Sequence, residues 1–332
     1  MSIESKLKSI ASELDKKLAA VAENVRPARS RLLVFTFHSL FSSAEETNFG
    51  FVDPQQKITT EKFRTFVAHF LEQGYQFVSP EKIVAGLNPV GNHAMITFDD
   101  GYFNNLRALP VLEEFQVPAV FCISTNHVMS GKPFWWDVLY REGSKNGLSS
   151  EEVDRARSEF KRMHTRDVEN KLVSEFGNTC FRTASDLDRP MTPGELQKLA
   201  NHPMASIGNH TCDHAILTNY PLSEVREQIC GAQEMLGTLT GQPPLLIAYP
   251  NGNVSADVVQ TARDAGLAVG VTVQPGLNRI GRGGQIRDIL VLRRFTLWGD
   301  SDIGTQCRIA RSPLPLQAAF ATIRAKMRNA SA

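Results

Sequence analysis

Acidic residues and histidines stand in two short clusters along this chain. Asp99 and Asp100 are adjacent and precede Gly101, whereas His210 and His214 are four residues apart. Two neighbouring carboxylates repel each other unless a cation or a proton lies between them. Two histidines at that spacing can bind one ion from a single turn of the chain. Together the clusters predict a metal site with two imidazole ligands and one carboxylate.

Such a ligand set leaves coordination positions open for water, as in a catalytic rather than a structural metal site. It also matches the ligands of non-haem Fe(II) sites, so the residues do not name the metal. We expect one divalent ion, with zinc as the first choice and iron, cobalt, nickel or manganese as alternatives. Either cluster alone has a simpler explanation, because Asp-Asp-Gly is a frequent turn sequence and histidine pairs are often solvated or buried. Their joint occurrence after predicted strands favours the metal.

Seven short apolar runs predict the strands that position these clusters. Helical patterns at 60–73, 104–115, 193–201, 223–239 and 255–265 fall between the runs at 32–37, 94–98, 118–123, 204–207, 245–248, 267–273 and 289–297. Strands that alternate with helices form a parallel sheet, and this number of strands predicts a closed or nearly closed α/β barrel. Functional groups of such barrels lie at the carboxyl ends of the strands. That rule selects His38, Asp99–Gly101, Asn209–His214 and Tyr249–Gly252.

The predicted barrel spans 32–299 and carries additions. Apolar residues at three- and four-residue spacing predict an amphipathic helix over 1–27. We expect this helix to pack on the barrel or on a second subunit of a homo-oligomer, with a membrane surface as the less favoured alternative. The segment 142–186 is charged and helical in pattern, which predicts a helical insertion. Residues 300–332 form a basic C-terminal segment with a helix.

The charge of the chain argues against nucleic acid as its main partner. Its 332 residues include 36 Lys and Arg against 35 Asp and Glu, a net charge of +1, whereas nucleic-acid-binding proteins are more often strongly basic. Residues 279–332 alone hold ten basic and three acidic residues. This excess indicates either a solvated surface or contact with an anionic substrate group or a membrane.

Cysteine usage and hydropathy predict a cytoplasmic protein, with the membrane surface as an alternative location. The five cysteines are widely spaced without any Cys-x-x-Cys, unlike a disulfide framework. The first 25 residues carry charges every few positions and lack the apolar core of a secretory signal. The longest uncharged stretch, 235–256, is interrupted by glycines and prolines, so no transmembrane segment is expected.

Three motifs resemble those of the polysaccharide deacetylase family, also called carbohydrate esterase family 4 or the NodB homology domain. Thr97–Gly101 reads TFDDG, the first motif of that family, and His210–His214 reads HTCDH, similar to its HTxxH motif. Ala248–Gly252 reads AYPNG and resembles the third motif. The resemblance covers about 32–299. It implies a distorted (β/α)7 barrel of the NodB type and metal-dependent removal of an N-acyl group, usually acetyl, from an amino sugar.

By position, the resemblance implies that Asp99 is the general base and that Asp100, His210 and His214 hold the metal. This agrees with the chemistry, since a divalent ion polarises an amide carbonyl and binds the attacking water, which a free carboxylate can deprotonate. The backbone N–H of Asn251 would help to hold the oxyanion.

The sequence departs from the family pattern at three functional positions. Asn251 replaces the usual Tyr of the third motif, which removes an aromatic ring from the pocket wall but keeps the backbone N–H. Ala248 replaces the Arg that often opens the third motif, so the cation beside Asp99 must come from elsewhere, and Arg294 is the candidate, with an ordinary salt bridge as the alternative. No histidine follows His214, although the family commonly takes its general acid from a C-terminal strand. His38 in Phe37–Leu40 resembles the N-terminal histidine of permuted members, so we expect it to be the general acid rather than a strand cap.

Aromatic residues near the predicted site are candidates for contact with a sugar. Trp135 and Trp136 could stack on a sugar ring, although such a pair is often part of the core. Asp137 could bind a sugar hydroxyl or lie in the outer shell of the metal, or could simply cap a helix. Tyr249 is a further candidate for substrate contact.

These observations predict a metal-dependent carbohydrate amide hydrolase. It would remove an acetyl or formyl group from an N-acylated amino sugar during surface polysaccharide or glycoconjugate synthesis, and a phosphate-linked substrate would suit the basic C-terminal region. The main alternative is a catalytically inactive carbohydrate-binding protein on the same fold. A phosphoesterase is a weaker alternative, because it would leave the histidine pair unexplained.

Overall fold

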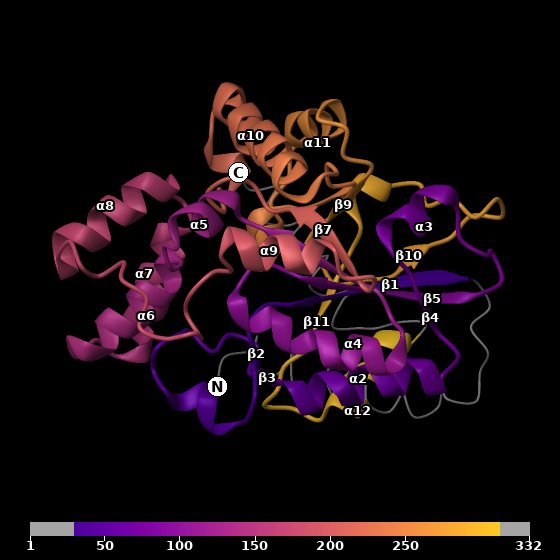
Figure 1. Ribbon diagram of the computed structural model, residues 1–332, viewed down its shortest axis with the longest axis horizontal. Coiled ribbons are helices and arrows are strands. Elements are labelled where there is room, and N and C mark those ends of the chain that lie inside the picture. The colour runs from indigo at the N-terminus through magenta and orange to yellow at the C-terminus, as the bar shows by residue number, and fades with distance from the viewer. Residues whose placement is uncertain (1–29, 313–332) are drawn as a thin grey trace, which may run out of the picture.

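A curved, mostly parallel sheet forms the centre of the computed structural model, which describes residues 30–312 (Figure 1). The order of its main path is β10-β1-β5-β6-β7-β8-β9, with β11 on β1 and β4 on β5. Its strands are β1 Arg31–Phe37, β4 Gln76–Phe77, β5 Asn92–Phe98, β6 Ala119–Ile123, β7 Ala205–Asn209, β8 Leu246–Ala248, β9 Val269–Val271, β10 Asn278–Arg279 and β11 Phe295–Thr296.

Two short contacts bring the far edges of this sheet together. On one side β11 pairs in parallel with β1, through Phe35 with Phe295. On the other side a single parallel bridge joins Val271 of β9 to Leu292, three residues before β11. The sheet therefore curves into an incompletely closed barrel, and the predicted α/β class with a distorted barrel of NodB type is confirmed.

Residues of β1 alternate between two cores, as a strand that is covered on both faces requires. Phe35 and Phe37 face the outer helices and belong to a cluster of phenylalanines. Leu32 and Val34 face the inside of the barrel. By the same alternation Thr36 and His38 point inward, at the carboxyl end of the strand. The sequence pattern of β1 thus fixes which side chains can reach the barrel mouth.

Helices cover the outside of the sheet, and many begin at a residue that caps them. The side chains of Thr59, Thr192 and Ser255 accept a hydrogen bond from the first turn of α2, α9 and α11, as helix N-caps do. The helices are α2 Thr60–Glu72, α3 Pro80–Ala85, α4 Leu109–Phe115, α5 Thr125–Ser130, α6 Trp135–Lys145, α7 Ser150–Phe160, α8 Thr165–Phe176, α9 Pro193–Ala200, α10 Leu222–Thr240, α11 Ala256–Asp264 and α12 Ile303–Arg311.

Shorter elements complete the described chain. A separate pair of strands, β2 Leu40–Phe41 and β3 Ile58–Thr59, follows β1. The 3-10 helices are η1 Glu45–Asn48, η2 Phe103–Ala108, η3 Leu217–Asn219, η4 Pro250–Gly252 and η5 Ile289–Val291. None of the helices within residues 30–312 combines the length and the apolar character that a membrane crossing needs.

The helical insertion is present but starts earlier than its predicted bounds of 142–186. Helices α6, α7 and α8 pack around a core of their own and project from one end of the barrel (Figure 1). Trp135 is already the first residue of α6. The predicted bounds missed the first seven residues of α6, about two turns, because this part is richer in apolar residues than the rest of the segment. The helix expected over 1–27 and most of 300–332 lie outside the described residues.

The late strand predicted over 289–297 is wrong in its bounds. Residues 289–291 form η5, and only Phe295–Thr296 pair as a strand. Between them the backbone N–H of Leu292 bonds to Gly270 of β9, while that of Arg293 bonds to the side-chain oxygen of Asn278. Because these N–H groups find partners in two different directions, no continuous ladder forms.

Arg279, Arg282 and Arg287 lie at the end of the barrel opposite to the carboxyl ends of its strands. β10 runs antiparallel to β1 and pairs Arg279 with Arg31, the first residue of β1. The loop that follows holds the exposed Arg282 and Arg287, and its Gly284 accepts a hydrogen bond from Leu87, ahead of β5. The expectation that these arginines contact a substrate bound at the predicted site is therefore wrong.

Candidate active site

The turn after β5 places two carboxylates in different directions. The backbone N–H of Asp99 still bonds to Phe37 of β1, so its side chain continues the inward row of the strand. Asp100 then adopts a left-handed backbone with φ of +79° and Gly101 one of +95°. That conformation costs energy for a residue other than glycine, and the hydrogen bond from Ser124 N–H to Asp100 O helps to hold it.

The loop after β7 presents the two histidines. His210 still bonds through its N–H to Ile123 of β6, and Asn209 Oδ1 accepts from Thr211 N–H at 2.8 Å. Thr211 and His214 have left-handed backbones with φ of +65° and +50°. Asp213 faces away and is held by Asn126 and Gln228. This tightly bonded loop brings both imidazoles back over the strand ends.

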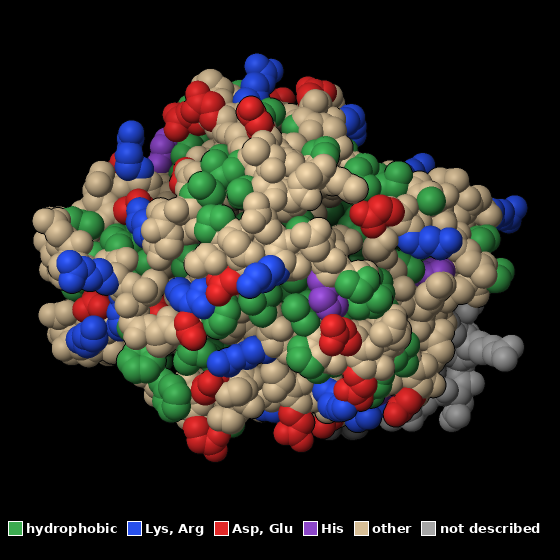
Figure 2. Space-filling view, in the orientation of Figure 1, with side chains coloured by type: hydrophobic (Ala, Val, Ile, Leu, Met, Phe, Trp, Pro, Cys, Tyr) green, Lys and Arg blue, Asp and Glu red, His purple; other side chains and the backbone are tan. Residues whose placement is uncertain are grey.

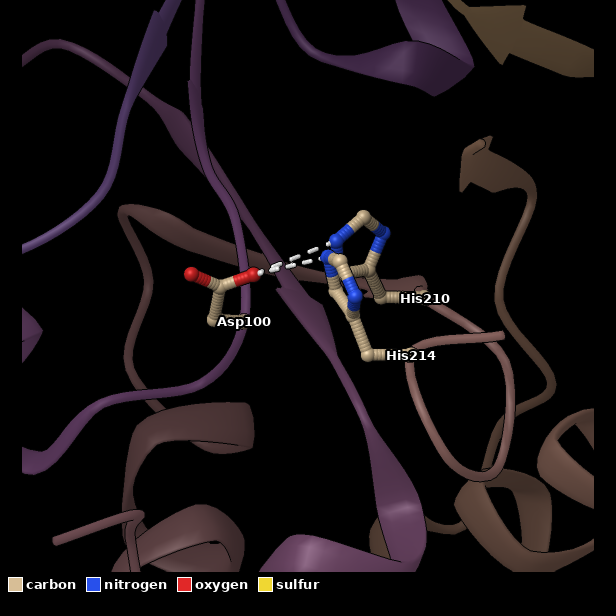
Figure 3. Close-up of side chains that lie close together, drawn as sticks. All are labelled: Asp100, His210 and His214. Atoms are coloured by element: carbon tan, nitrogen blue, oxygen red, sulfur yellow. Dashed lines mark ion pairs between the residues drawn. The ribbon is translucent and has the colours of Figure 1, made fainter. Parts of the chain in front are cut away.

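Asp100, His210 and His214 meet at one point (Figure 3). The Nε2 atoms of His210 and His214 lie 3.3 and 3.4 Å from Oδ1 of Asp100. Each residue can offer one ligand atom, and these atoms lie within 4.8 Å of one another. Both oxygens of Asp100 are buried without a hydrogen-bond partner among the described residues. An unpaired buried carboxylate beside two imidazoles fits a divalent cation.

Neighbouring groups prepare both imidazoles to act as ligands. Nδ1 of His210 donates to the carbonyl of Ala248 at 2.6 Å, which directs Nε2 toward Asp100, as outer partners of metal-bound histidines do. Burial and the proximity of His210 lower the pKa of His214 to about 3, so that its imidazole is neutral and keeps a lone pair. Trp136 packs edge-on against this ring, with centroids 4.6 Å apart.

Asp99 forms a buried ion pair with Arg294. The guanidinium reaches Oδ1 of Asp99 at 2.8 Å through Nη1 and Oδ2 at 2.7 Å through Nη2, while its other bonds go to Thr97 and to the carbonyl of Thr272. Burial alone would raise the pKa of Asp99, but Arg294 and the nearby histidines hold it well below its ordinary value. Asp99 is therefore ionised at neutral pH, and the cation expected at Arg294 is in place.

His38 lies at the same end of the barrel, partly buried. Phe37, the residue before His38, pairs with Phe98 and accepts a hydrogen bond from the N–H of Asp99, which places His38 at the same strand ends as Asp99. Nδ1 of His38 is 2.9 Å from Oε1 of Gln56. The turn with Asn251 follows β8 at this end too, and Asn251 has a left-handed backbone with φ of +56°. The structure thus brings together seven of the predicted residues: His38, Asp99, Asp100, His210, His214, Asn251 and Arg294.

The four side chains predicted to touch substrate are buried instead. Trp135 and Trp136 are 5% and 7% exposed, and Trp135 packs on Phe160 within the insertion. Asp137 is fully buried and accepts hydrogen bonds from the Tyr102 hydroxyl and from the N–H of Asp53. Tyr249 is also fully buried among apolar side chains. Burial of Trp135 and Trp136 favours the alternative that this pair is part of the core, and contact of the four residues with a sugar stays a prediction.

Two supporting residues carry no signal in the sequence. Tyr102 donates its hydroxyl proton to Asp137 at 2.6 Å and accepts from Trp136 Nε1 at 2.8 Å, which ties α6 to the Asp100 turn. Gln56 lies in a polar stretch that looks like an ordinary loop. Only its position beside His38 in the structure identifies Gln56 as part of the site.

The comparison with known families supports the reading of this site. A family model described as polysaccharide deacetylase matches residues 87–270, which is more than half of the chain and includes Asp99, Asp100, His210 and His214. The chain belongs to the polysaccharide deacetylase family. Membership of this family supports a hydrolase activity.

Individual relatives of this family member are distant. The Bacillus subtilis (strain 168) protein named "Putative polysaccharide deacetylase YxkH" is 21% identical over 225 residues, which cover 66% of this chain and 60% of YxkH. This deacetylase-family chain thus matches less than two thirds of the length of that relative.

Solved structures share the fold. The Streptococcus pyogenes deacetylase PplD, in complex with acetate, is 17% identical with a TM-score of 0.54 over 84% of this chain and 97% of PplD. IcaB from Ammonifex degensii is 16% identical with a TM-score of 0.53 over 88% of this chain and 97% of IcaB. At these identities the likeness establishes the fold alone.

Proposed function

We propose that this family member is a metal-dependent amide hydrolase that removes an acetyl or formyl group from an N-acylated amino sugar. The observation that carries the proposal is the unpaired, buried carboxylate of Asp100 between His210 and His214, next to the ionised Asp99. Zinc is the first choice of metal, and iron, cobalt, nickel and manganese are the alternatives.

Asp100, His210 and His214 would hold the ion, which when bound supplies a Lewis acid for the amide carbonyl and a water of lowered pKa. Asp99 takes the proton of the attacking water, and Arg294 keeps Asp99 ionised and fixed in direction. His38 gives a proton to the leaving nitrogen, which is needed because an amide anion is too basic to depart. The N–H of Asn251 donates to the developing oxyanion.

The proposal leaves the source of the sugar open. A phosphate-linked substrate loses its structural support, because the basic loop lies at the other end of the barrel. Location in the cytoplasm and association through 1–27 stay predictions. An inactive carbohydrate-binding protein remains the second candidate, because the third motif and the position of the general acid differ from the usual family pattern.

The experiment is a hydrolysis assay on matched variants. Protein stripped of metal and reloaded with each of the five divalent ions is given a panel of N-acetyl and N-formyl hexosamines and their oligomers, and released acetate or formate is measured. Asp99→Asn should keep the metal yet lose about 10²- to 10⁴-fold in turnover, whereas His214→Ala should lose the metal itself.

Each other outcome has a definite meaning. Loss of metal in Asp99→Asn would make Asp99 a ligand. A full equivalent of metal in His214→Ala would refute the ligand trio. Sugar binding without release of either acid, for every ion tried, would favour the inactive carbohydrate-binding protein.

A further inference from the structure

Gln56 is held in place by an unusual stretch of backbone. Its two neighbours, Gln55 and Lys57, both have left-handed backbones, with φ of +43° and +53°. Non-glycine residues in this region store strain, which persists only where surrounding contacts enforce it. Between them the side chain of Gln56 is 4% exposed. The side chain of Gln56 is therefore buried within a strained stretch of backbone.

A close approach of the late chain fixes this stretch further. The N–H of Gly299 donates to the carbonyl of Gln56 at 2.6 Å. A side chain at position 299 would overlap the carbonyl oxygen of Lys57, so only glycine allows the contact. Gln56 is thus clamped from both sides.

Four hydrogen bonds define the orientation of the Gln56 amide. Oε1 accepts from the backbone N–H of His38 at 2.9 Å and lies 2.9 Å from Nδ1 of the same residue. Nε2 donates to the carbonyls of Thr36 at 2.8 Å and Leu297 at 3.3 Å. Because a backbone N–H can only donate and a carbonyl can only accept, the amide cannot be turned round.

The orientation of Gln56 determines where His38 carries its proton. Oε1 has no proton to give, so Nδ1 of His38 must be the donor in their contact. In the neutral imidazole Nε2 then has the lone pair, and in the charged form Nε2–H is the proton that can leave while Nδ1–H stays bonded. Asn105 also holds His38, by donating to its carbonyl at 2.7 Å.

We propose that Gln56 is the positioning residue of the general acid: it fixes the Nδ1–H tautomer and the ring orientation of His38, so that Nε2 exchanges the proton with the substrate nitrogen. This rests on the proposed function of His38. A carboxylate would serve poorly in place of Gln56, since it would face the carbonyl oxygens of Thr36 and Leu297. The site is built for an amide, which accepts a hydrogen bond but does not take the proton.

The test compares Gln56→Met with Gln55→Met in the zinc-loaded, full-length protein. Methionine keeps the length of the side chain but removes the acceptor, and Gln55 is the matched neighbour that does not touch His38. Proton positions on the rings are read by NMR of protein labelled with ¹⁵N-histidine, and the His38 signals are assigned by their absence in His38→Ala. The kcat and KM for the best hexosamine substrate are measured in parallel.

We expect neutral His38 of the wild type to carry its proton on Nδ1. Gln56→Met should move the proton wholly or partly to Nε2 and lower kcat about 10- to 100-fold, with KM within about twofold, whereas Gln55→Met should change neither. An Nε2–H wild type overturns the proposal, as does a Gln56→Met protein with unchanged tautomer and kcat. The wild-type spectrum decides the point even where Gln56→Met does not fold.

The same data separate this inference from the proposed function. Hydrolysis together with an Nε2–H His38 refutes the role of Gln56 alone. An Nδ1–H His38 in a protein that hydrolyses no N-acyl sugar supports the Gln56 contact and refutes the deacylase.

Discussion

Adjacent residues with the same side chain have separate tasks because their surroundings differ. Asp99 forms an ion pair with Arg294. The carboxylate of Asp100 accepts no hydrogen bond from the described residues and lies beside two imidazoles. Such differences of environment assign roles to paired carboxylates in many enzymes. Among the contacts of single residues, removal of the Asp99–Arg294 ion pair should have the clearest effect on stability and on pH dependence.

Replacement of Arg294 by methionine should destabilise the protein strongly. A buried Asp99 would be left without its countercharge, which typically costs about 3–5 kcal/mol in the free energy of unfolding. Urea unfolding at pH 7 measures this. The exposed pair of Arg64 and Glu114 provides the control, since Arg64→Met should cost no more than about 1 kcal/mol. Equal losses in both variants would contradict the prediction.

The same variant should change the pH dependence. The pKa of Asp99 is lowered in the fold, so the pair stabilises the protein above the unfolded pKa of about 3.9, and this contribution is lost as the pH falls toward the lowered value. Without Arg294, burial raises the pKa of Asp99. The acid limb of the kcat/KM profile should therefore move to higher pH, and an unmoved limb would exclude Asp99 as the base.

Sequence could predict the residues whose identity is fixed by chemistry. The carboxylate and imidazole groups follow from residue type and spacing. Arg294 follows from the family resemblance, because Ala248 stands where the family often has the Arg beside the aspartate. Gln56 could not be predicted, because its role depends on strained backbone and on residue 299, far away in the chain. The substrate contacts assigned to Trp135, Trp136, Asp137 and Tyr249 stay predictions, since sequence shows that these residues lie near the site but not which way they face.

At the scale of elements, the insertion packs against the loop that carries His210 and His214. Trp136 of α6 packs on the His214 ring and donates to Tyr102, which follows the Asp100 turn. One helix therefore contacts both sides of the ligand set. This gives the insertion a structural task at the site, although its sequence looks like an addition to the barrel.

Trp136→Phe should weaken metal binding about tenfold, because groups behind a ligand usually contribute 10- to 100-fold. Phenylalanine is smaller against His214 and cannot donate to Tyr102. Trp135→Phe is the control, since that ring packs on Phe160, and its zinc affinity should stay within about twofold of the wild type. Competition with a chelator measures both affinities, and equal losses would show that α6 acts only through general stability.

Element prediction succeeded where hydrophobic periodicity was continuous. Helix α2 and strands β1, β5 and β6 lie within two residues of their predicted bounds. The run at 289–297 failed because its backbone is satisfied by an isolated bridge and by the side chain of Asn278. Periodicity cannot reveal such long-range partners.

At the scale of the whole molecule, the basic loop with Arg282 and Arg287 and the candidate active site lie at opposite ends of the barrel. Arg282 and Arg287 follow β10, beside the first residue of β1, whereas His38 follows its last. A strand of seven residues is about 23 Å long, which is well over two Debye lengths at physiological salt, where one is about 8 Å.

Charge reversal of Arg282 and Arg287 to glutamate should therefore leave KM within about twofold of the wild type at both about 0.1 M and about 1 M salt, where the Debye length is about 10 Å and about 3 Å. Direct contact between these arginines and an anionic substrate group would instead weaken substrate binding, more so at the lower salt concentration. Steady-state kinetics at the two salt concentrations decide between them. A KM that rises at low salt would restore the contact between these arginines and the substrate.

The two residues of the ion pair that keeps Asp99 ionised are synthesised at different times. Asp99 and Arg294 are 195 residues apart in the chain, and Gln56 reaches a carbonyl 241 residues later. At about 5–20 residues per second, a ribosome needs roughly 10–40 s to proceed from one member of the ion pair to the other. Toward the end of that time the nascent chain has most of the strands and both histidines, but no countercharge for Asp99. The last catalytic group to emerge thus sets the earliest moment at which the site can assemble.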